Sequence, residues 1–588
     1  MAGTSLAIGS FLLSTLLGLP FLRPLLGGVG LVVGGALLWG QGGAGGLFQL
    51  LLGLLTLALA FYLPPYLTHH GQAAADLGNT TPFYARLIPL FLATLAGVSL
   101  APPGYSFLFL WEGMSVLAYL LVALEGKEAI GGSQSLFLAS RFSGAALVLA
   151  FLGQTHLSKD LFWGLLLLGF GTKAALFPLH PWLVRAHPVA ISPVSALLSG
   201  AMTKLGLYGL YQSAVWFGPP PGWAGYTLLA LGLLGAVYAL ARGLAEDDFK
   251  GVLAYSSVEN LNLLLAALGG YFLWGTPFFL YAFFLHQLVH ALFKGLLFLA
   301  AGSLPSRSLS RLGGLFRQMP RLSALVLLGV VVAAGLPPFP GFFAEWYLAQ
   351  GLLGQKGQLA VLGVGAVGLL AALAPAFYAR LFGMAFLGLP RAAESHGGAF
   401  PPGKQADPSR REQIEDRGLL AGAGLLALFL LLLSLAPGLI LLPYQAPLSP
   451  LWGLLLLPFL GLGGAAWLRL RPHRTYSLWD CGFQPLTPRM QAPWGSAQSS
   501  SASSPSWAWT REGAGPGSGN PSFGRTGFPC GFTRRPRGVP RPCSREAFTF
   551  TSSSSSWPWL SSWGWCSDER VFAPPRPALH GEPEVVKG

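Results

Sequence analysis

The chain has 588 residues, of which 53% are hydrophobic and 10% are charged, whereas an ordinary soluble domain has about 25% charged residues. This composition excludes a soluble globular protein and predicts that lipid surrounds most of the chain. The net charge of +14 does not indicate a nucleic-acid partner, because the basic residues are scattered through short polar segments and form no patch with interleaved aromatic residues.

Apolar stretches follow one another from Ser5 to about Leu470. A membrane-spanning helix needs about 20 apolar residues, and about fifteen such stretches are present. Because no stretch alternates polar and apolar residues, we expect helices and not a β-barrel. The predicted fold is an all-α, polytopic transmembrane helix bundle of about 14–16 spans. The spans are expected at 5–22, 25–40, 46–66, 82–100, 103–124, 133–154, 160–184, 190–216, 222–243, 251–270, 274–303, 322–352, 357–388, 418–437 and 449–470.

Two of the predicted spans are interrupted by segments with several prolines close together. The seventh reads GFGTKAALFPLHPWL and the twelfth reads GLPPFPGFFAEWYL. Proline removes a backbone hydrogen bond and clashes with the preceding turn, so we expect both helices to break near the middle of the membrane. Two broken helices five spans apart are typical of inverted repeats with sites near the breaks. The residues expected to form the breaks are Pro178, Pro181, Pro337, Pro338 and Pro340.

The breaks suggest how the chain is organised. We expect N-terminal transmembrane helices at 1–81, two inverted five-helix repeats at 82–216 and 222–388, a polar cytoplasmic loop at 389–417, C-terminal transmembrane helices at 418–491 and a low-complexity tail at 492–588. The tail combines Ser, Pro, Gly and Arg with Trp, which disordered segments usually lack. The tail can be translated back into DNA with the codons TCC for serine, TGG for tryptophan and CTC for leucine. Reading that DNA in the frame that begins two bases later gives a run of Leu, Ala and Val. We therefore hypothesise out-of-frame translation after about Gln491, with a true low-complexity tail as the alternative.

Basic residues alternate between successive loops. Loops after even-numbered spans hold little more than Lys159 and Lys356. By the positive-inside rule, the loops after odd-numbered spans are expected in the cytoplasm and the N-terminus outside, in a multi-pass protein of the cell membrane. The loops after odd-numbered spans hold Arg23, Arg86, Lys127, Arg185, Arg242, Lys250, Arg307, Arg311, Arg317, Arg321 and the basic residues of 391–417 and 469–474.

Cysteine is nearly absent from the chain. None of the four cysteines, Cys481, Cys530, Cys543 and Cys566, belongs to a Cys-x-x-Cys motif. We therefore expect no iron–sulfur, haem or other cofactor in this chain, so any electron transfer takes place in another chain.

A few ionisable residues lie inside the apolar spans, where a charge costs at least about 2.5 kcal/mol, and each is therefore a candidate for function. Glu112 lies in the middle of the fifth span and is either a proton carrier or the structural partner of a cation. Lys173 precedes the break of the seventh span, where an approaching or withdrawing glutamate would make it bind or release a proton. Lys204 lies in the middle of the eighth span, and Glu345 lies beside the break of the twelfth.

Three polar residues share one face of the eleventh span. His286, His290 and Lys294 are spaced i, i+4 and i+8 in HQLVHALFKGLLFL. A histidine can take up a proton on one nitrogen and release one from the other. Metal binding by the two histidines is the alternative, although no carboxylate or third histidine is near in sequence. The predicted proton path consists of Glu112, Lys173, Lys204, His286, His290, Lys294 and Glu345.

Two further groups of polar residues have more than one interpretation. His180 and His187 flank the prolines of the seventh span and serve either to orient the broken helix or to transfer protons. Asp247, Asp248 and Lys250 precede the tenth span and form either a loop contact or a feature for proton uptake.

Several motifs resemble a known family. GTKAALFPLHPWLVRAHPVAISPVSALLSGAMTKLGLYGL, DDFKGVLAYSSVEN, HALFKGLLFLAAGS and GLPPFPGFFAEW resemble the antiporter-like, proton-translocating membrane subunits of complex I and membrane-bound hydrogenases. The resemblance covers about residues 45–390. YSSVEN and the later YSLWDCGFQPLTPRMQ are similar to the hydrogenase-4 component B and formate hydrogenlyase subunit 3 type. Departures are Val184 and Ile191, where prolines are usual, and Asn262, which replaces a common glycine.

The resemblance places the family's charged positions on the seven residues of the predicted path. It implies a proton-translocating subunit, without an active site of its own, in a redox-driven complex. The implied partners are other membrane subunits and a peripheral redox arm of the hydrogenase or NADH dehydrogenase type. The alternatives are a subunit of a multisubunit Na+/H+ antiporter and a non-conducting membrane anchor of a hydrogenase.

Overall fold

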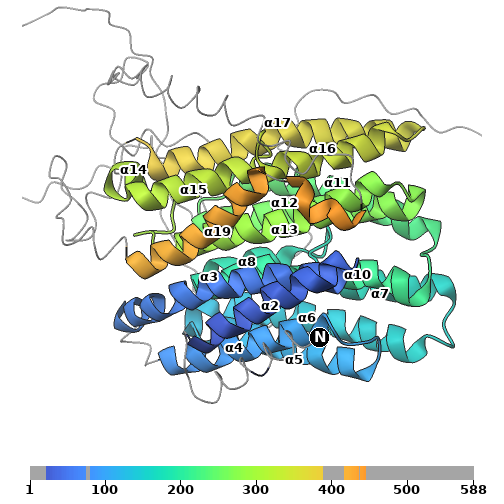
Figure 1. Cartoon of the computed structure of the whole chain (residues 1–588), viewed down its shortest axis with the longest axis horizontal. Coiled ribbons are helices and arrows are strands. Elements are labelled where there is room, and N and C mark those ends of the chain that lie inside the picture. Colours follow the sequence, from blue (N-terminus) through green and yellow to red (C-terminus); the bar gives the residue numbers. More distant parts are fainter. Residues whose placement is uncertain (1–8, 10–21, 74–79, 389–415, 436, 445–588) are drawn as a thin grey trace, which may run out of the picture. The chain divides into compact units, whose positions relative to one another are not determined.

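The computed structural model describes residues 9, 22–73, 80–388, 416–435 and 437–444. Within these ranges the regular structure is helical, apart from one isolated β-bridge between Asp248 and Ser308. The prediction of an all-α bundle is confirmed (Figure 1). The helices are α2 (Leu22–Gly40), α3 (Ala44–Ala73), α4 (Thr81–Val98), α5 (Tyr105–Ala123), α6 (Ile130–Gly153), α7 (Lys159–Lys173), α8 (Pro181–Val189), α9 (Ser192–Leu197), α10 (Thr203–Phe217), α11 (Gly222–Gly243), α12 (Phe249–Trp274), α13 (Pro277–Ala301), α14 (Leu315–Gln318), α15 (Pro320–Ala333), α16 (Pro340–Leu353), α17 (Gln358–Phe386) and α19 (Arg417–Leu435).

Every expected span that falls within the described residues coincides with a helix or a group of consecutive helices. In this part of the chain, nine helices are long and apolar enough to cross a membrane. The seventh span is the pair α7 and α8, and the twelfth is the pair α15 and α16. The expected spans at 5–22 and 449–470, the polar loop and the tail lie largely outside the described residues.

Both proline-rich segments interrupt their helices. Each gap contains a cis peptide bond, before Pro178 in the first and before Pro338 in the second. Pro181 and Pro340 begin the helices that follow, at a position where the missing backbone N–H has no helical partner to lose.

The side chain of Asn262, in α12, forms hydrogen bonds with the backbone of the first break. The Oδ1 atom of Asn262 accepts a hydrogen bond from the Phe177 amide (3.0 Å) and its Nδ2 donates to the Ala175 carbonyl (3.0 Å). On the other side of the gap, Trp182 Nε1 donates to the Thr172 carbonyl (2.8 Å). Backbone groups freed within a membrane must find partners in the protein. The asparagine that departs from the family pattern supplies two of them.

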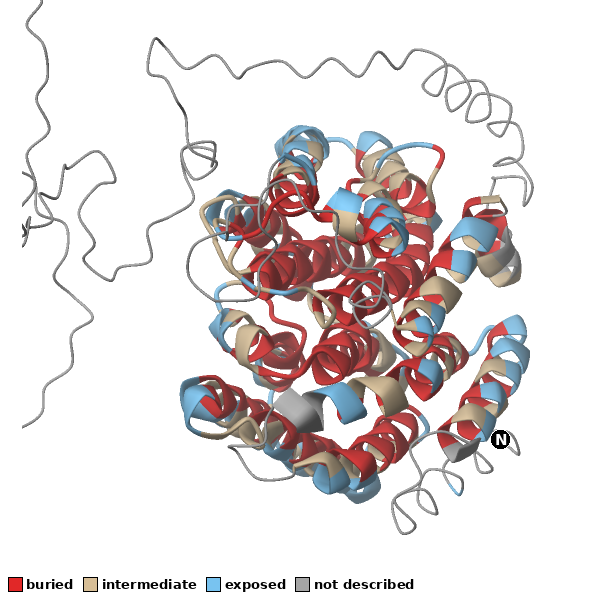
Figure 2. Cartoon of the chain, turned by 90° about the vertical axis from the view of Figure 1, so that its left-hand side faces the viewer, coloured by how far each residue is buried: buried red, intermediate tan, exposed pale blue. Residues whose placement is uncertain are grey.

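Two helices lie at the centre of the bundle. Every residue of α12 from Phe249 to Gly270 is buried, and so is every residue of α13 from Phe279 to Ala301. Helix α13 packs against α3, α9, α12, α15, α16 and α19. In Figure 2 fully buried helices are surrounded by helices with an exposed outer face. The ionisable residues of α12 and α13 therefore face protein and not lipid.

Candidate functional site

Lys173 is the last residue of α7, immediately before the first break. Its side chain is buried, and its Nζ donates hydrogen bonds to Ser115 Oγ of α5 and Ser140 Oγ of α6, both at 2.9 Å. The ammonium also lies 5.7 Å from the centre of the Trp111 ring, where the aromatic face attracts a cation. The direct partners of Lys173 are thus neutral groups.

Glu112 forms an ion pair with Arg141 of α6. A cation was the partner that the sequence offered for Glu112, and Arg141 is that cation, whereas Lys173 interacts with both charges only at longer range. The side chains of Glu112 and Arg141 are 29% and 36% exposed, but Glu112 Oε2 and Arg141 Nε and Nη2 are buried, so the charged ends of the pair are covered by protein. Gly144 makes room for the carboxylate, because a methyl group there would overlap it.

Arg141 was missed in the sequence. The signal was available, since it is a charged residue inside the apolar stretch SLFLASRFSGAALVL. Arg141 follows Ser140, a hydrogen-bond partner of Lys173, and interacts electrostatically with Lys173. Glu112 in turn lies one helical turn before Ser115, the other partner of Lys173. Helices α5, α6 and α7 therefore assemble one group of charges around the first break.

Lys204 begins a second group in the middle of the bundle. A π-helical turn at Leu198–Met202 precedes it, and such turns displace backbone groups from their regular helical partners. The Ser199 carbonyl accepts hydrogen bonds from Lys204 Nζ (2.5 Å) and Thr203 Oγ1 (2.9 Å). Lys204 Nζ also contacts Nδ1 of His290, and both side chains are fully buried. The structure therefore brings together a lysine and a histidine that lie far apart in sequence.

His286 lies one turn before His290, with 6.3 Å between the ring centres. Its Nε2 is 2.7 Å from Asn260 Oδ1 of α12. The Asn260 amide nitrogen donates to the Ser256 carbonyl (2.8 Å), which identifies Oδ1 as the acceptor of the amide and assigns the proton to Nε2 of His286. One histidine thus contacts a lysine, and the other a neutral amide.

Lys294 of α13 is hydrogen-bonded to two residues in the first half of α12. Its Nζ donates to the Leu253 carbonyl (2.9 Å) and to Ser256 Oγ. One turn further along α12 is Glu259, a buried carboxylate in contact with the Asn260 amide. Glu259 interacts electrostatically with Lys294 and with Glu345. Glu259 was not among the predicted path residues, although it is a charge inside an apolar span and stands in the YSSVEN motif.

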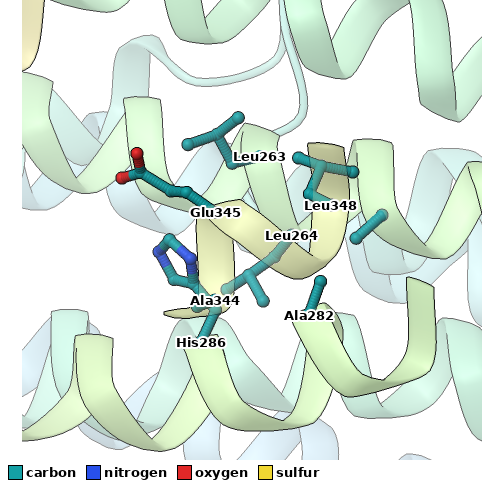
Figure 3. A pocket seen from close by; sticks show the side chains of 8 residues that line it. Leu263, Leu264, Ala282, His286, Ala344, Glu345 and Leu348 are labelled. Atoms are coloured by element: carbon teal, nitrogen blue, oxygen red, sulfur yellow. The ribbon is translucent and has the colours of Figure 1, made fainter. Parts of the chain in front are cut away.

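A small cavity separates His286 from Glu345 (Figure 3). Its other lining residues are aliphatic and come from α12, α13 and α16. Glu345 lies close to Gly335, the residue with a φ of +63° just after α15, and a methyl group there would lie 2.8 Å from Glu345 Oε2. The second break therefore needs glycine both for its backbone and for the approach of this carboxylate.

The seven predicted residues thus fall into two groups. Glu112 and Lys173 belong to the first, and Lys204, His286, His290, Lys294 and Glu345 belong to the second. Lys173 and Lys204 have separate hydrogen-bond partners. Across the described ranges, no group of three or more His, Cys, Asp or Glu side chains has an arrangement that could hold a metal ion.

The geometry defines a polytopic membrane protein with lysine, histidine and carboxylate groups aligned in its interior. Residues 105–370 match the family described as NADH:quinone oxidoreductase/Mrp antiporter, TM. NADH-quinone oxidoreductase subunit N of Desulforudis audaxviator is 30% identical over 400 residues, which cover 63% of this chain and 76% of that protein. The chain belongs to this family of antiporter-like membrane subunits.

Two further comparisons describe its relatives. Hydrogenase-4 component B of Escherichia coli K12 is 32% identical over 389 residues, which cover 59% of this chain and 56% of that protein. The chain therefore spans little more than half of that relative. A chain of the membrane-bound sulfane sulfur reductase, an archaeal respiratory membrane complex, superposes with a TM-score of 0.64 at 22% identity, over 81% of this chain and 86% of that chain. This second likeness supports the fold alone.

Proposed function

We propose that the chain is a proton-translocating membrane subunit of a redox-driven complex, of the hydrogenase-4/formate hydrogenlyase or NADH:quinone oxidoreductase type. The observation that carries the proposal is the buried contact between Lys204 and His290. Lipid-facing helices gain nothing from such groups, and ionisable residues inside a membrane bundle are typical of proton relays.

The second group of charges has the order that a relay needs. A protonated Lys204 donates to Nδ1 of His290, which leaves the proton of that imidazole on Nε2. Transfer of the Lys204 proton makes His290 an imidazolium, and the loss of its Nε2 proton restores a neutral ring. His286 is the next titratable group on the same helix, and the cavity beside it leads to Glu345.

The first group supplies a switch. In the structure Glu112 is paired with Arg141, and Lys173 has neutral hydrogen-bond partners. A movement of Glu112 from Arg141 towards Lys173 would stabilise the protonated lysine, and its return would favour release of the proton. Redox chemistry in a partner subunit would drive this exchange, since the side chains of both residues are partly exposed on this chain.

The remaining features of the assembly are part of the same proposal. We place the loops after odd-numbered spans in the cytoplasm, because they carry most of the basic residues. We assign the redox cofactors to a peripheral arm in other chains and expect neighbouring membrane subunits. A second candidate function is sodium/proton antiport within a multisubunit complex, since the matched family includes Mrp antiporters.

The test uses the complex purified through a tag on this chain and reconstituted into liposomes. A potassium gradient with valinomycin drives proton uptake, which pyranine inside the liposomes reports. We expect Lys173→Ala and Lys204→Met each to lower the rate by more than about tenfold, while the exposed loop variant Lys356→Met matches the unaltered complex. Wild-type rates in both buried variants, or no uptake by the unaltered complex, would show a non-conducting anchor. A rate that requires sodium would instead identify the antiporter.

A further inference from the structure

His187, in the last turn of α8, is a buried residue that the proposed relay does not use. Its side chain is fully buried, and neither ring nitrogen has a hydrogen-bond partner among the described residues. Buried polar atoms are nearly always paired, because leaving them without partners costs free energy. A phenylalanine would fill the same space without that cost, so the imidazole needs another explanation.

The imidazole lies beside the helix that carries the relay. Its ring stacks on Phe298 of α13, with 4.6 Å between the centres and 19° between the planes. Phe298 is one helical turn after Lys294, so the two side chains share a face of α13. The charged groups that act on His187 are Lys294, Lys250 and Lys204. Lys294 and Lys204 belong to the second group of charges described above, and Lys250 lies at the start of α12.

Lys250 is held against the end of the helix that carries His187. Its buried Nζ donates to the Ala190 carbonyl (2.7 Å), which follows α8. A cation at this position also complements the negative end of the helix. Lys250 interacts in turn with Asp248 and Arg307.

Water can reach this end of the bundle. Asp248 and Arg307 lie 3.6 Å apart and are 26% and 50% exposed, respectively. The segments that meet there follow the seventh, ninth and eleventh spans, which are all odd-numbered. Polar groups therefore extend from an exposed ion pair through Lys250 to His187 and then to the interior lysines.

We propose that His187 is a proton-transfer residue that connects Lys250, at the odd-loop end of the bundle, with Lys204 and Lys294 inside it. This inference rests on the proposed function. The neutral imidazole accepts a proton from the Lys250 ammonium on one nitrogen and gives the proton of the other nitrogen to a neutral interior lysine. Lys250, left as an amine, regains a proton from water at the loop surface, so one proton moves inward per cycle.

His180 offers a matched control in the same broken helix. It is also a buried histidine with a ring nitrogen that lacks a hydrogen-bond partner in the described structure. It also stacks on a phenylalanine, Phe177, with 5.6 Å between the ring centres. The difference that the control uses is electrostatic, because burial alone acts on His180 and no lysine does.

The test measures valinomycin-driven proton uptake by the reconstituted complex. We expect His187→Phe and His187→Gln each to lower the rate by more than about tenfold, while His180→Phe keeps the unaltered rate. Lys250→Met should lower the rate similarly, and the double variant Lys250→Met/His187→Phe should be no slower than either single variant, because both act in one route.

Each other outcome has a definite meaning. If His187→Phe conducts at the unaltered rate while Lys204→Met does not conduct, the role of His187 is refuted and the proposed function stands. Equal losses in His187→Phe and His180→Phe also refute that role, because they show a general requirement for aromatic packing in the broken helix. If Lys204→Met conducts normally, the proposed function fails and this inference fails with it.

Discussion

Replacing Asn262 by alanine should loosen the first broken helix. The substitution removes the acceptor of the Phe177 amide and the donor to the Ala175 carbonyl. Each backbone group left unpaired in a protein interior costs about 1–3 kcal/mol, so the two together cost about 2–6 kcal/mol. Phe177 is half-buried. Ala175 is fully buried.

The measurement is the free energy of unfolding in mixed micelles, titrated with sodium dodecyl sulfate and followed by tryptophan fluorescence. Gln355→Ala is the matched control, because Gln355 is also an amide that donates two hydrogen bonds, to Thr276 Oγ1 (2.9 Å) and the Gly351 carbonyl (3.2 Å), but at a half-buried helix end. It should cost less than about 1 kcal/mol. If Asn262→Ala lowers the free energy of unfolding by no more than Gln355→Ala does, the Asn262 side chain does not stabilise the first break.

Two more predictions use the same unfolding assay. Gly335→Ala should lower the free energy of unfolding by about 1–3 kcal/mol, because it places a non-glycine residue at a positive φ and adds a methyl group against Glu345. Gly275→Ala, with a similar φ of +65° and open space around it, should cost only the free energy of the strained φ. Equal losses in the two variants would contradict the close approach of Glu345. Burial raises the pKa of the Asp248 carboxyl above its ordinary value. The folded state therefore binds that proton more tightly than the unfolded state does, so the carboxyl destabilises the fold above its folded pKa and has no such effect below about pH 3.9. Asp248→Asn, which keeps the capping oxygen, should raise the unfolding midpoint at about pH 7 but not at about pH 3.5; an equal gain at both pH values would exclude this cause.

The sequence was sufficient to place the two broken helices. A proline in the interior of a helix has no N–H to donate, and each broken span has several prolines close together, whereas the single Pro89 and Pro375 leave α4 and α17 continuous. The common face of His286, His290 and Lys294 was predictable for a similar reason, because their spacing depends only on the geometry of the helix itself.

The partner of Glu112 could not be obtained in the same way. Which cation it meets depends on how α5, α6 and α7 are rotated about their axes, and apolar spans carry no periodic signal for that rotation. Arg141 and Lys173 both lie within electrostatic reach, and only the packing selects Arg141 for the ion pair. Glu259 could have been found as a charge inside an apolar span, but its position between Lys294 and Glu345 required the structure.

The full burial of α12 and α13 has a consequence for the biogenesis of the protein. These two helices are less hydrophobic than α17 and α19, and 94% and 100% of their apolar stretches are buried, against 28% for α17. Insertion into the bilayer depends on the hydrophobicity of each segment. Helices α15, α16 and α19 cover α13 and are synthesised after it. Until then, α12 and α13 need to be kept out of contact with lipid by the insertion machinery or by the helices synthesised earlier. The polar residues of the interior therefore make the chain dependent on synthesis through α19 before its centre is shielded from lipid.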